Sequence, residues 1–246
     1  MKWNAACRLA TPLALMAMLA ACGTDKPAGS PQATASASAA ADAPPALPVV
    51  GEEMRIVALG DSLFAGYGVD PSQSYPARIE AALRARGINA KMTNAGVSGD
   101  TTSGGLQRVD FVIDSMEKPP QMVLISLGGN DMLRGLPPEE TRRNLSAILA
   151  KFKARGVKVV LMGMLAPPNL GADYAAKFNP IYPALAREYG ATLVPFFLQP
   201  VVSRPDLIQA DRIHPTAQGI DLLVGATVDQ VAGALPVSPA APPAPR

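Results

Sequence analysis

The sequence has few cysteine and histidine residues and no excess of charge of either sign. Both cysteines, Cys7 and Cys22, lie near the N-terminus, so the rest of the chain contains no disulfide and no free thiol. Because His214 is the single histidine, any chemistry that depends on an imidazole must use it. The formal charge is +2, and loss of Lys2 and Arg8 with a leader would leave 20 positive against 20 negative side chains. A near-neutral chain argues against nucleic acid as a partner, because phosphate binding needs a basic face.

The first 21 residues have the pattern of a secretion signal. A positively charged start precedes an apolar stretch of about a dozen residues, Leu9 to Leu19, which is too short to span a bilayer. Cys22 follows Leu-Ala-Ala directly, and this run resembles the lipobox of bacterial lipoproteins, in which the cysteine becomes the first residue and carries lipid. We therefore expect residues 1–21 to be a lipoprotein signal peptide and Cys22 to be the lipidation site. In the alternative, the signal is an ordinary secretory one and Cys22 has no role.

The segments beside this signal predict where the folded body lies. Gly23 after the cysteine resembles lipoproteins sent to the outer membrane, so the expected location is the cell envelope, anchored by lipid at the periplasmic face of that membrane. Residues 22–50 are rich in Ala, Pro, Ser and Thr, which is typical of a tether. Residues 236–246 form a similar Ala/Pro-rich tail. Residues 51–235 are enough for one domain with its own core.

The body alternates short apolar runs with amphipathic stretches. Strands are predicted at 54–59, 88–93, 122–127, 157–165 and 192–197. Helices are predicted at 75–86, 102–116, 138–155, 172–189 and 216–235, and Pro180 and Pro183 are expected to break or kink the fourth of them. Strands separated by helices indicate a mostly parallel sheet with right-handed crossovers. We therefore predict an α/β fold, a three-layer α/β/α sandwich around a sheet of about five strands.

Candidate catalytic residues follow the predicted strands at their carboxyl ends, where ligands bind in open α/β sheets. Ser62 comes after the first strand, and His214 precedes the last helix on the same side. Asp211 stands three residues before His214, so its carboxylate can reach one ring nitrogen while the other faces a hydroxyl. In such an arrangement the acid orients the histidine, and the histidine takes the proton of the serine.

The intermediate of this reaction is an oxyanion, which needs hydrogen-bond donors. Three candidates lie at the same edge of the sheet: the backbone N–H groups of Ser62 and Gly96 and the side-chain amide of Asn130. Glycine allows the backbone to approach a substrate closely, and asparagine donates without carrying charge. Each motif alone is typical of a turn, but together, each at a strand end, they favour one shared site.

Four motifs of the body resemble the blocks of the SGNH hydrolases, also called GDSL esterases. They are Gly60-Asp61-Ser62-Leu63, then Gly96, then Gly128-Gly129-Asn130-Asp131, then Asp211-x-x-His214-Pro215. The runs that begin at Asn94 and Gly128 are similar to the branch of periplasmic acyl-thioesterases, lysophospholipases and arylesterases. The resemblance implies a flavodoxin-like sheet, no metal and no organic cofactor. It also implies that Ser62 is the nucleophile, His214 the base and Asp211 its orienting acid, with Gly96 and Asn130 completing the oxyanion hole.

Several residues near these motifs have weaker assignments. Asp61 and Asp131 are expected to brace loops, and Arg108 and Arg134 to be isolated surface charges. Apolar residues that are candidates for a groove holding an acyl or aryl chain are Phe64, Tyr67, Tyr75, Met132, Leu133, Leu136, Met164, Leu165, Pro167 and Pro168.

The expected function is that of a serine esterase that cleaves small-molecule acyl esters and thioesters through an acyl-enzyme. We expect a monomer that meets the membrane through its lipid anchor. Two alternatives stay open: a carbohydrate O-acetyl esterase acting on cell-envelope polymers, and a non-catalytic lipid-binding lipoprotein. A phosphate-binding module is disfavoured, because no Gly-x-Gly-x-x-Gly turn leads into a helix.

Overall fold

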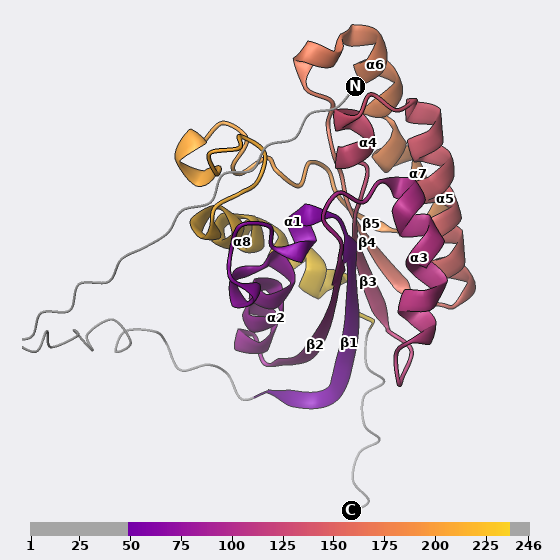
Figure 1. Cartoon of the computed structure of the whole chain (residues 1–246). Coiled ribbons are helices and arrows are strands. Elements are labelled where there is room, and N and C mark those ends of the chain that lie inside the picture. The colour runs from indigo at the N-terminus through magenta and orange to yellow at the C-terminus, as the bar shows by residue number, and fades with distance from the viewer. Residues whose placement is uncertain (1–48, 237–246) are drawn as a thin grey trace, which may run out of the picture. The chain divides into compact units, whose positions relative to one another are not determined.

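The structure is a computed structural model that describes residues 49–236 (Figure 1). The predicted signal peptide and Cys22 lie outside the described residues, as do the predicted tether and tail apart from the residues next to the body. In the part of the chain that the structure describes, no helix combines the length and apolar character needed to cross a membrane.

Five parallel strands form a single sheet in the order β2-β1-β3-β4-β5. The strands are β1 (Val50–Gly60), β2 (Ile88–Gly96), β3 (Met122–Ser126), β4 (Lys158–Met162) and β5 (Thr192–Val194). This is the flavodoxin-like order, in which the direction of winding reverses between β1 and β3. The predicted fold class is therefore confirmed, and the reversal places a crevice at the carboxyl ends of these two strands.

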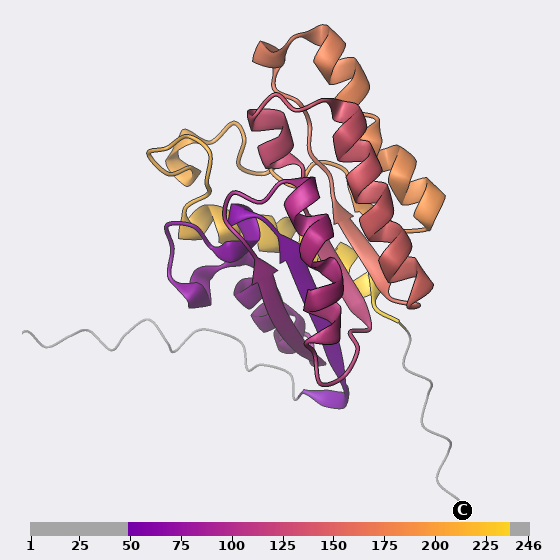
Figure 2. The same cartoon turned by 45° about the vertical axis from the view of Figure 1, so that its right-hand side comes forward.

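Helices cover both faces of the sheet (Figures 1 and 2). One layer contains α2 (Tyr75–Ala85) and α8 (Ala217–Ala234), and the other contains α3 (Thr102–Asp114), α5 (Pro138–Ala154) and α7 (Ile181–Tyr189). The shorter elements are α1 (Ser62–Ala65), α4 (Gly129–Leu133) and α6 (Ala172–Phe178), with 3-10 turns at η1 (Pro71–Gln73), η2 (Pro168–Leu170) and η3 (Pro205–Leu207).

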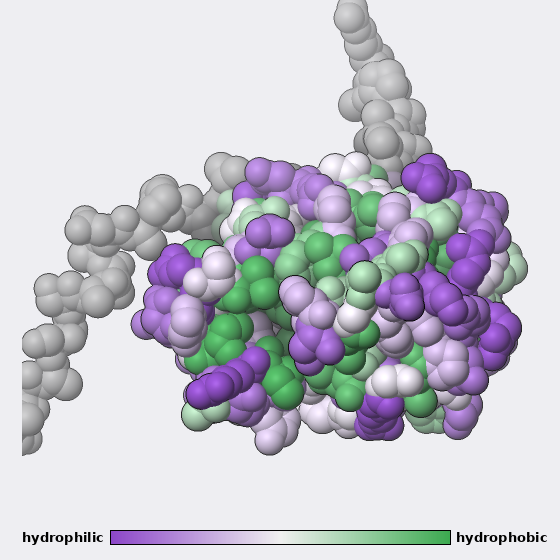
Figure 3. Space-filling view, turned by 90° about the horizontal axis from the view of Figure 1, so that it is seen from above, coloured by the Kyte–Doolittle hydropathy of each residue, from purple (hydrophilic) through white to green (hydrophobic). Residues whose placement is uncertain are grey.

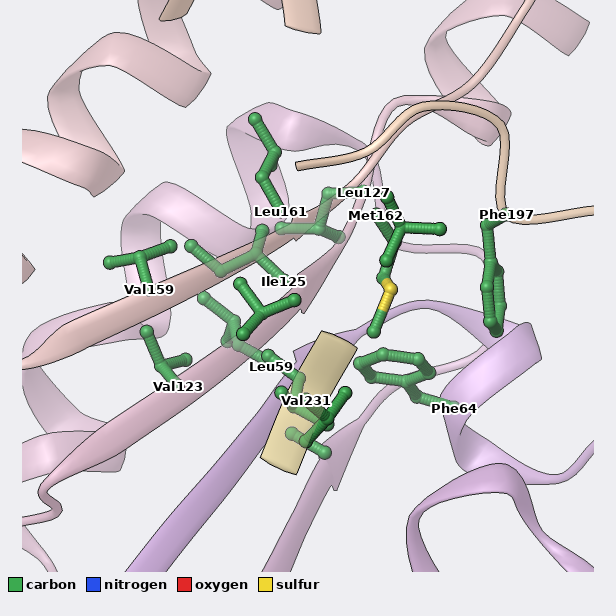
Figure 4. Packing of buried hydrophobic residues seen from close by; sticks show 14 of the residues in the cluster. Leu59, Phe64, Val123, Ile125, Leu127, Val159, Leu161, Met162, Phe197 and Val231 are labelled. Atoms are coloured by element: carbon green, nitrogen blue, oxygen red, sulfur yellow. The ribbon is translucent and has the colours of Figure 1, made fainter. Parts of the chain in front are cut away.

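The residues of the central strands explain why they lie in the middle of the sheet. Every residue of β3 is buried, as expected for a parallel strand covered by helices on both faces. Figure 4 shows Phe64 beside Phe197 and Met162 in this core. The rings of Phe64 and Tyr75 stack at a centroid distance of 5.3 Å, and both side chains are fully buried. These two aromatics are therefore part of the core, which corrects their assignment to the substrate groove.

Helix boundaries follow local chemistry. The predicted helix 172–189 is two helices, because Pro180 has no N–H to continue the first one. Pro183 is tolerated in the first turn of α7, where an N–H has no partner in the helix. Thr216 caps α8 by accepting a hydrogen bond from the Gly219 N–H at 3.2 Å. Helices α1 and α4 were not predicted, because four or five residues are too few to show a helical period.

Candidate active site

A pocket of about 680 Å³ opens at the carboxyl ends of the strands. Figure 3 looks onto this face, where hydrophobic residues gather. The polar residues that line the pocket are Asp61, Ser62, Ser98, Asn130, Arg212 and His214, together with Gly99 and Gly129. The rest of the lining is apolar, so the pocket combines a narrow polar rim with a large apolar wall.

Ser62 is the first residue of α1, and only Asp61 separates it from the end of β1 at Gly60. The Asp61 carboxylate accepts a hydrogen bond from the Leu63 N–H at 3.0 Å and so caps this short helix. Phe64 then anchors α1 in the core, and a Cβ at Gly60 would lie 2.7 Å from its ring. The Ser62 N–H stands at the first position of the helix, so it has no helical partner, and it donates to no described residue. The sequence thus presents both the hydroxyl and the N–H of Ser62 at the pocket.

His214 and Asp211 lie on the loop between η3 and α8. The Nε2 atom of His214 is 2.7 Å from the Ser62 Oγ, and its Nδ1 atom is 2.6 Å from Asp211 Oδ2. The other carboxylate oxygen of Asp211 accepts from the N–H groups of Ile213 and His214, at 2.9 and 3.0 Å. The structure therefore brings Ser62, His214 and Asp211 together in one hydrogen-bonded chain, as the sequence predicted.

Two further features hold this loop. Arg212 has a positive φ of 61°, which turns the backbone so that the two following N–H groups face the Asp211 carboxylate. The Tyr67 ring packs on the His214 ring at a centroid distance of 4.5 Å.

Hydrogen bonds from the His214 side chain and from the backbone lower the pKa of Asp211 to about 2. Asp211 is therefore ionised at neutral pH, in the form that orients the imidazole.

The structure does not bring Gly96 to the pocket, and this corrects its assignment to the oxyanion hole. The Gly96 N–H donates to the Asn94 side chain at 2.9 Å. A Cβ at Gly96 would lie 2.3 Å from the Ala65 backbone nitrogen, so this glycine is needed for β2 to pack against α1. The sequence has a glycine at the end of β2, Gly96, and another three residues later, Gly99, and spacing alone does not decide which of them reaches the pocket.

Gly99, three residues further along the chain, is a glycine of this loop that does line the pocket. It lines the pocket together with Ser62 and Asn130, and its N–H donates to no described residue. Its φ is +85°, a conformation that favours glycine. The Val97 carbonyl accepts from the Asp100 N–H at 3.1 Å, so residues 97–100 form a β-turn with Gly99 at its third position.

Asn130 lies in α4 and lines the same pocket. Its Nδ2 donates to the Asp100 carbonyl at 2.9 Å and lies 3.5 Å from the Asp61 carboxylate. An amide nitrogen carries two hydrogens, so the bond to Asp100 fixes its direction, and the second hydrogen, which makes only the long contact to Asp61, can turn to a stronger acceptor. Asn130 is thus where the sequence predicted it, beside the serine.

Buried carboxylates brace the surrounding loops, as expected. Burial raises the pKa of Asp61 to about 7, against the hydrogen bond from Leu63, which lowers it. Asp131 accepts from the Thr102 N–H at 2.8 Å and from the hydroxyls of Thr102 and Thr141. Asp61 therefore connects the nucleophile turn to α4, and Asp131 connects α4 to α3 and α5.

Two arginines that were expected to be isolated surface charges hold the pocket loops instead. Arg108 donates to the Asp100 carboxylate at 2.6 Å and to the Gly60 carbonyl at 2.9 Å, and its side chain is only 20% exposed. Arg134 donates to the Gly99 carbonyl at 2.7 Å. The two carbonyl partners are 48 and 35 residues away in the chain from their arginines, which is why the sequence around each arginine gave no sign of them.

Most of the predicted groove residues line the pocket, but not all. Phe64, Tyr75 and Leu136 are absent from the wall, whereas the others are present: Tyr67, Met132, Leu133, Met164, Leu165, Pro167 and Pro168. The additional apolar residues of the wall are Leu63, Ala166, Phe196, Leu198, Val202 and Ile213. Phe196, Leu198 and Val202 follow β5 in a segment without regular structure, so no periodicity marked them. Within residues 49–236, no group of three or more His, Cys, Asp or Glu side chains is placed to hold a metal ion.

A serine, a histidine and an aspartate joined by hydrogen bonds, beside amide donors on a flavodoxin-like sheet, define a serine hydrolase site. Comparison with known proteins gives the family. The model of the GDSL-like lipase/acylhydrolase family matches residues 58–222, and the chain belongs to this family.

Named relatives agree with this assignment. The chain is 41% identical over 160 residues to the esterase TesA of Pseudomonas aeruginosa. The aligned region covers 65% of this chain and 79% of that relative. It is 40% identical over 161 residues to an arylesterase of Vibrio mimicus. That aligned region covers 65% of this chain and 80% of the arylesterase.

Solved structures share the fold. The crystal structure of AlinE4, an SGNH-hydrolase family esterase, is 58% identical with a TM-score of 0.65, over 76% of this chain and all of that chain. A crystal structure of TesA is 36% identical with a TM-score of 0.70, over 74% of this chain and 99% of that one.

Proposed function

We propose that this protein, a carboxylic ester hydrolase of the GDSL family, cleaves acyl esters and thioesters through an acyl-enzyme on Ser62. The observation that carries the proposal is the chain of contacts from Ser62 Oγ to His214 Nε2 and from His214 Nδ1 to Asp211, at 2.7 and 2.6 Å. These distances suit transfer of the hydroxyl proton to a neutral imidazole.

The first step forms the acyl-enzyme. Ser62 Oγ attacks the carbonyl carbon while His214 Nε2 takes the hydroxyl proton, and Asp211 stabilises the imidazolium that results. The carbonyl oxygen becomes an oxyanion, and the donors around it are the N–H groups of Ser62 and Gly99 and the amide of Asn130. The intermediate then collapses. The bond to the leaving group breaks, and the alcohol or thiol takes the proton from His214.

The second step returns the free enzyme. A water molecule gives a proton to His214 and attacks the acyl carbonyl, and a second oxyanion forms against the same donors. Its collapse breaks the bond to Ser62 Oγ, which recovers the proton from His214. The carboxylic acid leaves, and no atom is gained or lost by the protein.

The pocket wall supports an acyl or aryl ester as the substrate. It is mostly apolar and has room for a chain of several carbons beside Ser62. A carbohydrate O-acetyl ester would need polar partners for its hydroxyl groups, and the described wall offers few of them.

The test is hydrolysis of a nitrophenyl butyrate by the native protein and by Ser62→Ala, together with labelling by a fluorophosphonate. We expect Ser62→Ala to lose the activity and the label. Equal rates in both proteins would remove Ser62 as the nucleophile, and an absence of labelling in the native protein would favour a non-catalytic lipoprotein.

We further propose that Cys22 carries lipid and anchors the protein at the periplasmic face of the outer membrane, and that the body is a monomer. The support for the lipid and its location is the Leu-Ala-Ala-Cys run with Gly23 after it. Mass spectrometry of the mature N-terminus of the native protein and of Cys22→Ser tests the lipid. Fractionation of membranes tests the location, and sedimentation of the body tests the oligomeric state.

A further inference from the structure

Arg134 is an exposed arginine whose side chain reaches from one oxyanion donor to another. It stands directly after α4, the helix that carries Asn130. Its Nη2 donates to the Gly99 carbonyl at 2.7 Å, and no carboxylate among the described residues forms an ion pair with it. The bond joins two loops that are 35 residues apart in the chain.

The Gly99 N–H belongs to the middle peptide of the 97–100 turn. A positive φ at the third position corresponds to a type II turn, and a type I turn differs mainly by rotation of that middle peptide. Glycine adopts φ of either sign at little cost, so the sequence of this turn does not by itself fix where the N–H points. Contacts from outside the turn must restrain it.

Three such contacts converge on the end of the turn. Asn130 donates to the Asp100 carbonyl at 2.9 Å, Arg108 donates to the Asp100 carboxylate at 2.6 Å, and Arg134 donates to the Gly99 carbonyl. The bond from Arg134 is made to the Gly99 carbonyl, which belongs to the peptide after the middle one, so it holds the turn as a whole against α4, on which Asn130 lies. It also crosses the space beside Gly99, where a Cβ would lie 3.6 Å from the guanidinium.

We propose that Arg134 is a positioning residue that holds the Gly99 N–H at a fixed place relative to the Asn130 amide. The proposal rests on the proposed function, because it assigns these two groups to the same oxyanion. Arg134 itself does not touch the reacting atoms. It stabilises the transition state by keeping two donors preorganised, and it contributes little to holding the acyl chain, which lies against the apolar wall.

The experiment compares Arg134→Met and Arg134→Lys with a matched control, Arg142→Met. Arg142 is an exposed arginine on α5 that pairs with Glu188, away from the pocket. For each protein we would measure kcat and KM for nitrophenyl butyrate, the Ki of an alkyl trifluoromethyl ketone, which forms an oxyanion on the serine, and the Ki of a long-chain alcohol, which occupies only the apolar wall. Thermal unfolding reports whether each variant folds.

Loss of a direct oxyanion donor costs roughly 100- to 1,000-fold in kcat, so loss of a restraint on one donor is expected to cost about 10- to 100-fold. Arg134→Met should lose this in kcat at nearly constant KM, and the Ki of the ketone should rise by the factor that kcat/KM loses. The Ki of the alcohol should not change. Arg134→Lys should recover part of the activity, because one donor remains, and Arg142→Met should behave as the native protein.

A raised KM at constant kcat would overturn the proposal, since Arg134 would then bind substrate. Parallel loss of ketone and alcohol binding would also overturn it, since the whole pocket would have changed. The proposed function fails by a separate result, namely unchanged activity in Ser62→Ala.

Discussion

The two halves of the triad are held in place by different means. Ser62 begins a helix that Phe64 anchors among buried aromatic rings, so the nucleophile rests on the core. His214 and Asp211 lie on a partly exposed loop, where short-range hydrogen bonds and the Tyr67 ring hold them. Changes to the buried anchor of Ser62 should therefore affect the stability of the fold, whereas changes to the His214 and Asp211 side chains should affect catalysis with little effect on stability.

The largest effect is expected from His214→Ala. Without the imidazole, no described group can take the Ser62 proton, so kcat should fall by about 10⁴-fold or more. The unfolding temperature should change little, because the loop contributes few buried contacts. Steady-state hydrolysis of a nitrophenyl ester and a thermal scan check both parts. Activity within tenfold of the native protein would show that another group is the base.

Phe64→Ala, unlike His214→Ala, should mainly lower the stability of the fold. Removing a fully buried ring leaves a cavity, and the free energy of unfolding should fall by about 3–5 kcal/mol. Phe111→Ala is the matched control, because this ring is 75% exposed on α3. Urea denaturation of the two variants measures the difference. Equal costs would mean that the nucleophile turn does not depend on the core.

The pH dependence of stability tests Asp61, the buried carboxyl beside the nucleophile. Its pKa in the folded protein, about 7, lies above the ordinary value of 3.8, so the folded state binds the proton more tightly than the unfolded state. The free energy of unfolding should therefore fall by at most about 4 kcal/mol as pH rises from about 4 to about 7. Above that pH it should level off.

Asp61→Asn should remove this dependence, because an amide does not ionise and its oxygen still accepts from the Leu63 N–H. Denaturation of both proteins at pH 5 and pH 8 measures the effect. The prediction is wrong if the native protein and the variant lose the same stability between these pH values.

Gly96 and Gly99 separate a packing role from a role at the pocket. An alanine at 96 would meet the Ala65 backbone, so Gly96→Ala should cost about 1–3 kcal/mol of stability. A Cβ at 99 would make only an ordinary contact, 3.6 Å from the Arg134 guanidinium, but φ is positive there, so Gly99→Ala should cost about 1 kcal/mol and reduce kcat by tilting its N–H. Denaturation and steady-state kinetics of both variants check this order. A larger loss of stability in Gly99→Ala would reverse the two assignments.

The smallest effect is expected from Arg212→Gly. Glycine adopts the positive φ at 212 without strain, which stabilises the folded state, but it also has more conformational freedom in the unfolded chain, which destabilises the fold. Because these two effects oppose each other, the free energy of unfolding should change by no more than about 1 kcal/mol. Activity should be nearly unchanged if the backbone turn alone matters for Asp211. A large loss of kcat would show that the Arg212 side chain takes part at the pocket.

The sequence predicted those parts of the protein that depend on local pattern. Apolar runs separated by amphipathic stretches predicted the five strands and the layers, and the Asp211–His214 spacing predicted the acid–base pair, because both groups lie on one short segment. Ser62 and Asn130 were found because each lies within a few residues of the carboxyl end of a strand.

The rest depends on contacts between distant segments. The sequence pointed to Gly96 alone, because the position of the strand end does not show which nearby glycine the chain turns toward the pocket. Phe64 was assigned to the groove because its neighbour is the nucleophile, although the turn sends its ring into the core. Arg108 and Arg134 looked isolated because each donates to a backbone carbonyl far away in the chain, that of Gly60 or Gly99, which no side-chain pattern reveals.

The most direct test of the central claim is the mass of the protein during turnover. A nitrophenyl ester is mixed with excess protein and the reaction is quenched in acid. The protein is then digested with a protease, and the masses of the peptides are measured by mass spectrometry. We expect one acyl group on the peptide that contains Ser62, and none in Ser62→Ala. Release of nitrophenol with no acyl group on that peptide, or with the group on another residue, would contradict the account.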